Sequence, residues 1–536
     1  MFLKRRRFIK QSVLSSLALG TSYFLHHYLI NKRRSYNFNG AIVGANYKLG
    51  HLLNQKHNIL SYATKEIDTI IVGGGISGMS AAWWLNKNNK TDFILLEMDK
   101  ELGGNSVSNE NSVSKYPWGA HYVTLPSEES SYVRLLFEEI GIITGYQKGL
   151  PIYNEFYLCA APQERLFFQG KWQEGLVPLI GIQEEDKRQY KNFFHFISEL
   201  KYLKGLDQKP LFCIPLENSS QNNEYIKLDK ISMKEFMLSN GWTSKYLNWY
   251  VNYCCRDDYG RSYEKVSAWA GIHFFVSRVG FAANADSNSV LTWPEGNGFL
   301  VNYLKKYSQR QIKKNSLVVS VENMEKNCSL IVFDTKEHKY TQYNCRNVIY
   351  SAPRYTADKV IKNYHSNNLP EYSPWLVANI TVKNFPLNGD YLAWDNVNFY
   401  SKSLGYIVAN HQDLRTMQKE IVLTYYLPLD EKEPWEERKQ AYKRSYQDWL
   451  DIIILDLEMT HKDFSKYIIQ LDVWIWGHGM SSPGINFLWS DKRKNLLKPF
   501  GNIFFAHSDM SGISIFEEAQ YRGIEAAKSV ISRNKL

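Results

Sequence analysis

The chain has 536 residues and a formal net charge of +10. The first 34 residues hold eight of the 64 Lys and Arg residues and no acid, so 56 basic residues face 54 acidic ones in the rest of the chain. A nearly neutral body argues against a nucleic-acid partner, which would need a basic surface.

The N-terminal segment, residues 1–34, joins a basic stretch, "MFLKRRRFIK", to the mostly apolar "SVLSSLALGTSYFLHHYLI". It resembles a twin-arginine export signal, whose pattern is filled here by Arg5, Arg6, Phe8, Ile9 and Lys10. The resemblance implies passage through the twin-arginine translocation machinery across the inner membrane to the periplasm. A plain basic flank before a membrane anchor is the alternative. Both interpretations place this end at a membrane, and an uncleaved anchor stays open. Residues 35–64 are predicted to be a linker.

A glycine-rich turn follows in "DTIIVGGGISGMSAAWWLNK", which starts at Asp68 and predicts a short buried strand and then a helix of small residues. Gly73, Gly75 and Gly78 fit G-x-G-x-x-G, in which the glycines allow the tight turn, the approach of a pyrophosphate, and helix–strand contact. The alternative is a turn without chemical meaning. A second strand, "TDFILLEMD", ends at Glu97, 24 positions after Gly73, where a carboxylate can bind a ribose diol. The spacing predicts a dinucleotide site.

The next segment indicates which dinucleotide binds. "MDKELGGNSVS" resembles the extended FAD fingerprint of flavin-containing amine oxidases, with Gly103 and Gly104 matching and Asn105 standing where Arg is usual. "YPWGAHYV" occupies the place where that family passes the isoalloxazine ring, so Gly119 is expected to let the backbone approach the ring and His121 to lie close by.

Three later segments match the same family in the expected order. "WPEGNGFLVNYLKK" resembles its "P-x-G-G" segment, and "SLVVSVENM" supplies the strand whose Val319 or Val321 is implied to lie against adenine. "CRNVIYSAPRY" resembles the return that ends in "A-x-P". Each alone could be a simple hairpin. The C-terminal "GNIFFAHSDMSGISIFEEAQYRGIEAAKSVI" predicts a strand and a helix starting near Ser514, whose positive end would face the flavin, with Asp509 on the ribityl chain. A surface-loop Asp is the alternative.

The intervening segments predict a substrate domain. Alternating runs such as "WLVANITVKNF" and "EIVLTYYLPL" indicate an antiparallel sheet, covered by helices such as "MKEFMLSNGWTSKYLNWYVNYCC". The predicted fold is therefore α/β, with a Rossmann-type FAD-binding domain (65–149, 286–370 and 491–536) interleaved with an α+β substrate domain built on an antiparallel sheet (150–285 and 371–490). The six cysteines include no C-x-x-C pair and support no metal site; Cys254 and Cys255 are expected to be buried thiols.

The site prediction combines these segments. The expected FAD-binding residues are Gly73, Gly75, Ile76, Ser77, Gly78, Glu97, Met98, Gly103, Gly104, Asn105, Trp118, Gly119, Ala120, Val319, Val321, Ser351, Ala352, Pro353, Asp509, Ser514 and Ile515. The expected catalytic residues are His121, His478 and Trp476, with structural histidines as the alternative, and no metal is expected. "CCRDDYG" gathers Arg256, Asp257 and Asp258, which we expect on a solvated face or in a salt-bridge network.

Two departures from the family bear on the substrate. Many amine oxidases place a lysine near flavin N5 on the strand after "A-x-P", where this chain has Ala378, and an aromatic residue before the last helix, where it has Ile515. We expect an amine-oxidase-like oxidation of a small organic substrate by hydride transfer to flavin N5, with electrons passing to oxygen, a membrane quinone or another acceptor. A C–C desaturase of the same superfamily and a protein with a structural flavin are the alternatives. Only one dinucleotide fingerprint is found, so we expect no nicotinamide to deliver electrons.

Overall fold

The computed structural model describes residues 35–44, 46–55, 63–366, 369–386, 392–413 and 419–533. The predicted export segment lies outside these residues. Among the described residues, no helix has the length and apolar character needed to cross a bilayer.

The first of two large sheets is the Rossmann-type sheet, whose seven strands follow the order β12-β3-β2-β15-β14-β13, with β21 also pairing with β15. Strands β2, β3, β12, β15 and β21 run parallel, with the helix α3 crossing from β2 to β3, and β13–β15 form an antiparallel meander. The strand bounds are β2 Ala63–Val72, β3 Phe93–Leu96, β12 Ile312–Lys313, β13 Ser316–Asn323, β14 Cys328–Asp334, β15 Lys339–Tyr350 and β21 Ile503–Phe505.

One face of this sheet is covered by helices that are rich in small or apolar residues. Gly523 of the C-terminal helix packs so closely on the first helix that an added Cβ would lie 2.0 Å from the Ser77 carbonyl oxygen. The buried cluster on this face includes Ile71, Leu95 and Ile349 from three neighbouring strands. The helices here are α3 Ile76–Lys87, α4 Ser131–Ile140, α10 Gly298–Tyr307 and α15 Phe516–Arg533.

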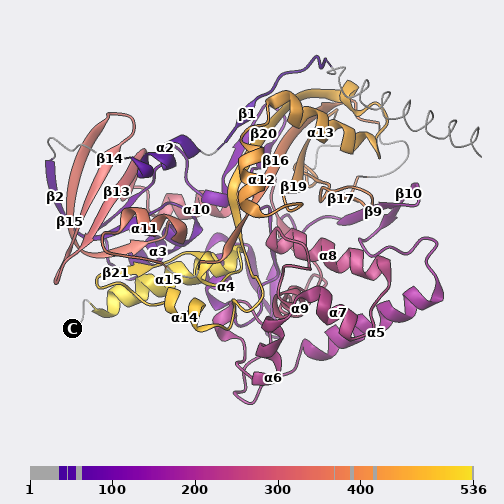
Figure 1. Ribbon diagram of the computed structural model, residues 1–536, viewed down its shortest axis with the longest axis horizontal. Helices are drawn as coiled ribbons and strands as arrows, with labels where there is room; N and C mark the ends of the chain where they lie inside the picture. The colour runs from indigo at the N-terminus through magenta and orange to yellow at the C-terminus, as the bar shows by residue number, and fades with distance from the viewer. Residues whose placement is uncertain are drawn as a thin grey trace, which may run out of the picture.

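The second large sheet has eight strands in the order β1-β20-β16-β19-β18-β17-β9-β10 and is mainly antiparallel. Its strands are β1 Ile42–Val43, β9 Glu164–Phe168, β10 Lys171–Glu174, β16 Glu371–Lys383, β17 Asp395–Asn398, β18 Tyr406–Val408, β19 Glu420–Pro428 and β20 Ile468–Ser482. Helices α12 Pro434–Ala441 and α13 Tyr446–Glu458 lie beside it (Figure 1). Part of the predicted linker, residues 39–43, runs along β20 as the edge of this sheet.

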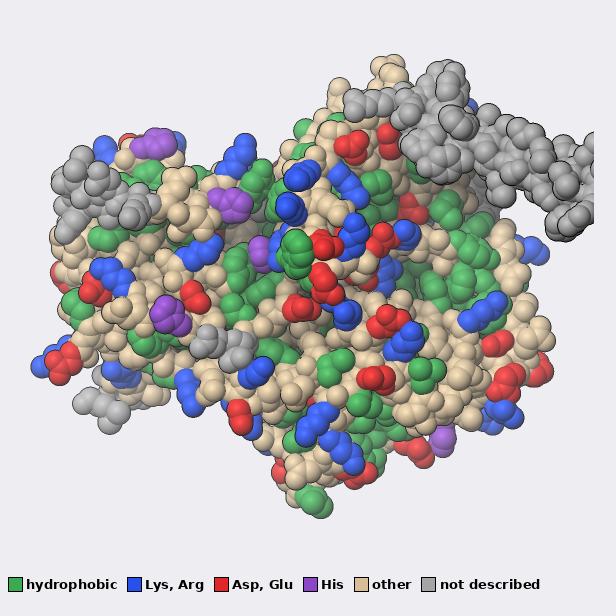
Figure 2. Space-filling model, viewed as in Figure 1, with side chains coloured by type: hydrophobic (Ala, Val, Ile, Leu, Met, Phe, Trp, Pro, Cys, Tyr) green, Lys and Arg blue, Asp and Glu red, His purple; other side chains and the backbone are tan. Residues whose placement is uncertain are grey.

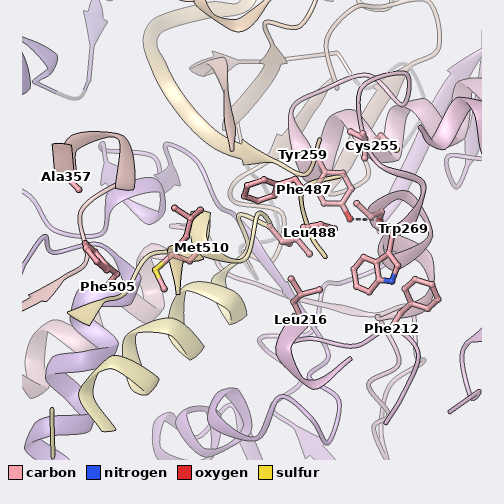
Figure 3. Close-up of a cluster of buried hydrophobic side chains, with 14 of the residues drawn as sticks. Phe212, Leu216, Cys255, Tyr259, Trp269, Ala357, Phe487, Leu488, Phe505 and Met510 are labelled. Atoms are coloured by element: carbon pink, nitrogen blue, oxygen red, sulfur yellow. Dashed lines mark hydrogen bonds between the residues drawn. The ribbon is translucent and has the colours of Figure 1, made fainter. Parts of the chain in front are cut away.

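A helical region lies below this sheet in Figure 1. Its helices are α5 Glu184–Leu200, α6 Asn223–Ile226, α7 Met233–Ser239, α8 Lys245–Tyr259 and α9 Ala268–Val276. One buried cluster extends from the Rossmann-type sheet into these helices: Phe505 and Met510 lie at one end, and Phe212 and Trp269 at the other (Figure 3). The two parts of the chain therefore share a core.

The remaining elements are short. They are α2 Tyr47–His51, α11 Ala357–Val360 and α14 Asp491–Leu496, the small strands β4 Ser108–Glu110, β5 Lys115–Pro117, β6 Tyr122–Thr124, β7 Ile143–Gln147, β8 Leu150–Tyr153 and β11 Val290–Thr292, and seven 3-10 turns, η1–η7, among the described residues.

The predicted fold class is confirmed: a Rossmann-type domain is interleaved with a second domain built on an antiparallel sheet. Segments 65–149, 286–370 and 491–536 all contribute strands to the Rossmann-type sheet. Cys254 and Cys255 are buried free thiols, as expected. Basic and acidic side chains are interspersed on the face shown in Figure 2, in keeping with the nearly neutral body.

Candidate cofactor crevice and active site

The three glycines of the first loop serve different purposes. Gly73 has a φ of +103°, which L side chains rarely adopt. A Cβ on Gly78 would lie 2.0 Å from the Gly73 carbonyl oxygen, so only glycine lets the helix touch the loop. A Cβ on Gly75 would have no protein atom within 4 Å. The protein's own packing does not require glycine at that position, so the open space there is available to a ligand.

The helix after this loop is suited to an anion. Gly75 is the N-cap of α3 and brings no side chain to the cap, so the N–H groups of Ile76 and Ser77 have no intrahelical or capping acceptor. Such N–H groups, with the positive end of the helix dipole, form a ready site for phosphate. The predicted pyrophosphate site thus has both room and donors.

Glu97 lies beside the loop at the end of β3. Its Oε2 accepts a hydrogen bond from the Gly74 backbone N–H at 2.6 Å, and its Oε1 accepts one from the Asp99 N–H at 2.8 Å. Burial raises the pKa of Glu97 to about 7, against the opposing effect of these hydrogen bonds. Each oxygen keeps a further lone pair, so the carboxylate can still accept from a ribose hydroxyl.

The second glycine loop packs on the first. Gly103 and Gly104 have φ values of +119° and +56°, and the Gly103 N–H donates to the Gly74 carbonyl at 2.9 Å. Asn105, which stands where the family has Arg, donates its side-chain N–H to the carbonyl of Gly479 in β20. Asn105 therefore links the crevice to the second sheet.

The segment predicted to pass the flavin ring is held by protein contacts. A Cβ on Gly119 would lie 2.3 Å from the Asn105 carbonyl oxygen, so packing against the second loop requires glycine here whether or not a ring approaches. Trp118 is buried, its carbonyl accepts the indole N–H of Trp476 at 2.7 Å, and the Ala120 N–H donates to the Asn105 carbonyl at 2.8 Å. The hydrogen bond from Trp476 therefore fixes the Trp118 backbone to the second sheet.

The two valines predicted near adenine lie in different surroundings. Val321 is fully buried in the shared core and pairs with Leu330. Val319 lies at a bulge in β13, where the register with β14 skips it. A skipped residue has backbone groups that the strand partner leaves free, so Val319 is the better candidate for an adenine contact.

The return loop and the C-terminal segment meet at a buried carboxylate. Ser351 donates its hydroxyl to the Gly73 carbonyl at 2.8 Å, which places Ser351, Ala352 and Pro353 against the first loop. Asp509 is wholly buried: its Oδ2 accepts from the Arg354 N–H and the Tyr372 hydroxyl, both at 2.7 Å.

The other carboxylate oxygen of Asp509 has one close neighbour. Its Oδ1 lies 3.1 Å from Nδ1 of His507, and that ring nitrogen itself accepts the Asp509 N–H. Oδ1 accepts no hydrogen bond from the described residues, so it is a buried acceptor that is still open. A cofactor hydroxyl would satisfy it, which fits the predicted ribityl contact.

The final helix begins slightly later than predicted, at Phe516 instead of near Ser514. The Ser514 hydroxyl accepts the Ser481 N–H of β20 at 2.8 Å. Ile515, in the place of the family's aromatic residue, packs against the shared core. β20 therefore contacts the crevice at both Asn105 and Ser514.

The predicted catalytic histidines lie in different environments. His478 is exposed and stacks on Tyr355 at 4.2 Å, and partial desolvation with the charge of Arg438 lowers its pKa. His121 instead stacks on Tyr426 with ring centroids 4.6 Å apart, and burial lowers its pKa to about 4. His121 is therefore neutral at pH 7. The two histidines stack on different rings, and their rings do not contact each other.

The strand position matched to the family's lysine was wrong. Ala378 lies in the buried cluster with α13 residues such as Trp449, on the outer face of the sheet. Side chains alternate along a strand, so its neighbour Val377 faces the opposite way, into the cluster that contains Trp118. Asn379 also faces that way and donates to the Pro117 carbonyl at 2.9 Å.

Aromatic residues from distant segments surround His121. Tyr122 and Trp394 have ring centroids 5.2 and 5.5 Å from it, and the Tyr426 hydroxyl donates to the Gly119 carbonyl at 2.9 Å. These rings lie directly beside the segment predicted to pass the flavin. Only His121 was expected here, because Trp394 and Tyr426 are some 270 to 300 positions away in sequence.

Acidic residues adjoin these rings. Asp258 pairs with Arg278, the Tyr253 hydroxyl donates to Asp395 at 3.4 Å, and Tyr122 lies close enough to Asp257 to influence its pKa. We call this set the acid–aromatic cluster: Glu164, Asp257, Asp258, Asp395 and Arg278 with His121, Tyr122, Tyr253, Trp394 and Tyr426.

The acids of the cluster outnumber its one arginine. Burial, followed by repulsion from Asp258, raises the pKa of Asp257 to about 7, and burial with repulsion from Glu164 raises that of Asp395 well above its usual range. A bound cation would relieve this repulsion. The expectation of a salt-bridge network holds for Arg256, which pairs with Asp430 at 2.9 Å, and for Asp258. Asp257 belongs to the cluster instead.

Comparison with known proteins agrees with this geometry. Residues 71–140 match a family model described as an NAD(P)-binding Rossmann-like domain. The chain is 22% identical over 529 residues to oxidoreductase PigB of Serratia sp. (strain ATCC 39006), covering 87% of this chain and 75% of that protein. It superposes on wild-type putrescine oxidase bound to putrescine (TM-score 0.63, 14% identity) and on cyclohexylamine oxidase from Brevibacterium oxydans IH-35A (TM-score 0.62, 12% identity). Each superposition covers 88% of this chain and 100% of the other. The chain has the fold of these amine oxidases.

Proposed function

We propose that the protein is an FAD-dependent oxidoreductase that oxidises an amine beside the acid–aromatic cluster. The cluster carries the proposal, because it places an excess of carboxylates and several aromatic faces next to the Trp118–Gly119 segment. A cationic amine bound beside these acids would lower their raised pKa values and favour the carboxylate forms, which attract it, and aromatic faces bind cations through their quadrupole. The amine substrates named for the structurally similar oxidases, putrescine and cyclohexylamine, are consistent with this chemistry.

The choice of FAD rests on the crevice. The open space at Gly75, the uncapped start of α3, and Glu97 suit any dinucleotide. The second loop at Gly103–Gly104 and the buried acceptor on Asp509 fit the extended FAD fingerprint of the flavin-containing amine oxidases. FAD, when bound, accepts a hydride equivalent at N5. The chain then has to bind and orient the substrate and exclude water.

Asp257 and His121 of the cluster suit different tasks at the substrate. Asp257, with a pKa near 7, can hold or release a proton around neutral pH. His121, neutral and hydrogen-bonded through Nδ1 to the Gly119 carbonyl at 3.2 Å, can donate from only one nitrogen and is better suited to orient a substrate than to protonate it.

An anaerobic substrate screen tests the function. Purified yellow protein is mixed with mono- and diamines, amino acids and polyenes, and flavin absorbance is followed. We expect an amine to bleach the flavin, and Asp257→Asn or Asp395→Asn to raise KM for that amine while FAD content stays unchanged. Glu264→Gln, an exposed acid paired with Lys234, is the matched control. Bleaching by no amine would contradict the proposal.

A second candidate is a C–C dehydrogenase. The positions of β16 that face the site, Trp375, Val377 and Asn379, include no lysine, which favours chemistry that does not need one. Bleaching by a polyene and by no amine in the same screen would support this candidate. A flavin that even a strong photoreductant fails to bleach would indicate a structural role.

We further propose that the N-terminal segment directs export across the inner membrane. This proposal is supported by the sequence pattern. Export would make oxygen, a membrane quinone or another periplasmic acceptor the destination of the electrons. An exported enzyme has little access to NADPH, which agrees with the single dinucleotide fingerprint.

A further inference from the structure

The segment predicted to be a linker contacts both domains. Its first part is fixed to the second sheet: the Val473 N–H donates to the Ala41 carbonyl at 2.9 Å, and the Ala41 N–H donates to Asp472 at 3.0 Å. A Cβ on Gly44 would lie 2.7 Å from the ring of Trp474, so the chain runs closely over that side chain. Beyond this point residues 46–55, here called the crossing segment, lie against the Rossmann-type domain.

The crossing segment contacts one side of the crevice at Asp99. The Asn46 backbone N–H lies 3.5 Å from the Asp99 carboxylate, and Asp99 follows the predicted ribose ligand Glu97 by two positions. Asn46 also caps α2, since its side chain accepts the Leu49 N–H at 3.4 Å. The start of the segment is therefore held next to the loop that carries Glu97.

Its other end contacts the opposite side of the crevice. Lys359 of α11 donates its Nζ to the side-chain oxygen of Asn54, and Leu53 packs on the buried cluster that includes Val360. α11 follows Ala352–Pro353, the return loop that lies against Gly73. In Figure 1, α2 lies above α3 and α11. The segment thus reaches from the Glu97 loop to the element after the return loop.

A third set of contacts faces the second domain. The Tyr47 ring lies 4.6 Å from that of Tyr442, which follows α12. The crossing segment therefore touches both sides of the crevice and the second domain.

We propose that residues 46–55 close the outer mouth of the dinucleotide crevice and retain FAD. The proposal rests on the proposed function in that the crevice binds FAD. A dinucleotide held between the Glu97 loop and the return loop can leave through this mouth only after the contacts of Asn46, Tyr47 and Asn54 open, so these contacts should slow release.

The test measures FAD release from the purified full-length holoprotein. After dilution, free FAD is followed by its fluorescence, with the visible spectrum recorded beforehand. In Asn54→Lys the new cation faces Lys359, and we expect release to be about tenfold faster, the effect of losing one hydrogen bond and adding a repulsion. Lys359→Asp added to this variant restores attraction and should return the rate to near that of the wild type. Tyr47→Ala should also speed release.

Tyr202→Ala is the matched control, because Tyr202 is an exposed aromatic residue outside the crossing segment. Release rates in Asn54→Lys and Tyr47→Ala equal to the wild-type rate would overturn the proposed closure. Faster release without recovery in the Lys359→Asp double variant would also overturn the pairing across the mouth. A wild-type protein that binds no FAD would instead refute the proposed function.

Discussion

Gly75 and Gly78 lie three positions apart in the same loop and helix, yet alanine should affect them in opposite ways. At Gly78 the new Cβ would lie 2.0 Å from the Gly73 carbonyl oxygen and 2.6 Å from the Ser351 hydroxyl. The helix would have to move away from the strand, and overpacking of this kind costs about 1–3 kcal/mol or more. Gly78→Ala should therefore destabilise the protein with or without cofactor.

At Gly75 the backbone is extended, with φ −73° and ψ −177°, and no protein atom lies within 4 Å of the added Cβ. Alanine is a poorer N-cap than glycine by roughly 0.5–1 kcal/mol. It also restricts the unfolded chain, which returns about 0.4–1 kcal/mol. These terms nearly cancel, so the apoprotein of Gly75→Ala should be as stable as the wild type, whereas FAD, which needs the space of the Cβ, should bind weakly.

Thermal unfolding with and without FAD separates the two effects. At an FAD concentration of about 100 times Kd, binding stabilises the wild type by about 2.7 kcal/mol, and Gly75→Ala should lack most of that gain. Gly78→Ala should unfold at a lower temperature in both conditions. A Gly75→Ala protein that gains full stability from FAD would refute the assignment of Gly75 to the pyrophosphate. If the apoprotein of Gly75→Ala were as unstable as that of Gly78→Ala, the argument that protein packing leaves room at position 75 would be refuted.

Four further predictions follow from the same features. Replacing Arg5, Arg6 and Arg7 by lysine should retain the protein inside the cell, and unaltered export on fractionation would favour a plain membrane anchor. Excess NADH or NADPH should leave the flavin absorbance unchanged over minutes under anaerobic conditions. Rapid bleaching would contradict the proposal that the organic substrate delivers the electrons to the flavin. Glu97→Ala should weaken FAD binding by about 1–3 kcal/mol in a fluorescence titration, and an equal affinity would count against its ribose contact. Because the pKa of Asp257 is raised from 3.8 to about 7, the folded state keeps a proton that the unfolded state has lost between these values, so stability should fall as the pH rises through this window. Asp257→Asn should flatten that decline in urea unfolding at pH 5 and pH 8, and an unchanged slope would show that Asp257 does not titrate there.

The geometry of the first glycine loop could be predicted because it is local. Gly73, Gly75 and Gly78 lie within six positions, and their roles in turn, open space and helix contact depend on backbone geometry that the spacing already implies. Glu97 could be placed for the same reason, since the next parallel strand ends beside the loop. The sequence therefore predicted the Rossmann-type fold and the arrangement of its first loop.

The acid–aromatic cluster could not be predicted in the same way. Its members come from β6, β9, α8, β17 and β19 and from loops beside β6, α9 and β17, and the pairing of β17 with β9 brings Asp395 next to Glu164. The mistake at Ala378 has a related cause. Side chains alternate along a strand, so an alignment displaced by one residue moves the position from the inner to the outer face of the sheet.

The departures from the amine-oxidase pattern have a common structural outcome. Asn105 donates to Gly479 of β20, Ile515 packs into the shared core, and Asn379 donates to the Pro117 carbonyl and accepts from the Thr424 hydroxyl at 2.7 Å. All three residues make contacts within the protein. They lie at or beside positions where the family implies contacts with cofactor or substrate. Under the proposed function, polar recognition of the substrate would come from other elements, and the acidic side chains of β9, α8 and β17 beside His121 are the candidates for it. Under the proposed function, differences in substrate between this chain and its structural relatives should map to these three elements and not to the glycine loops, which are proposed to bind a cofactor that does not change with the substrate.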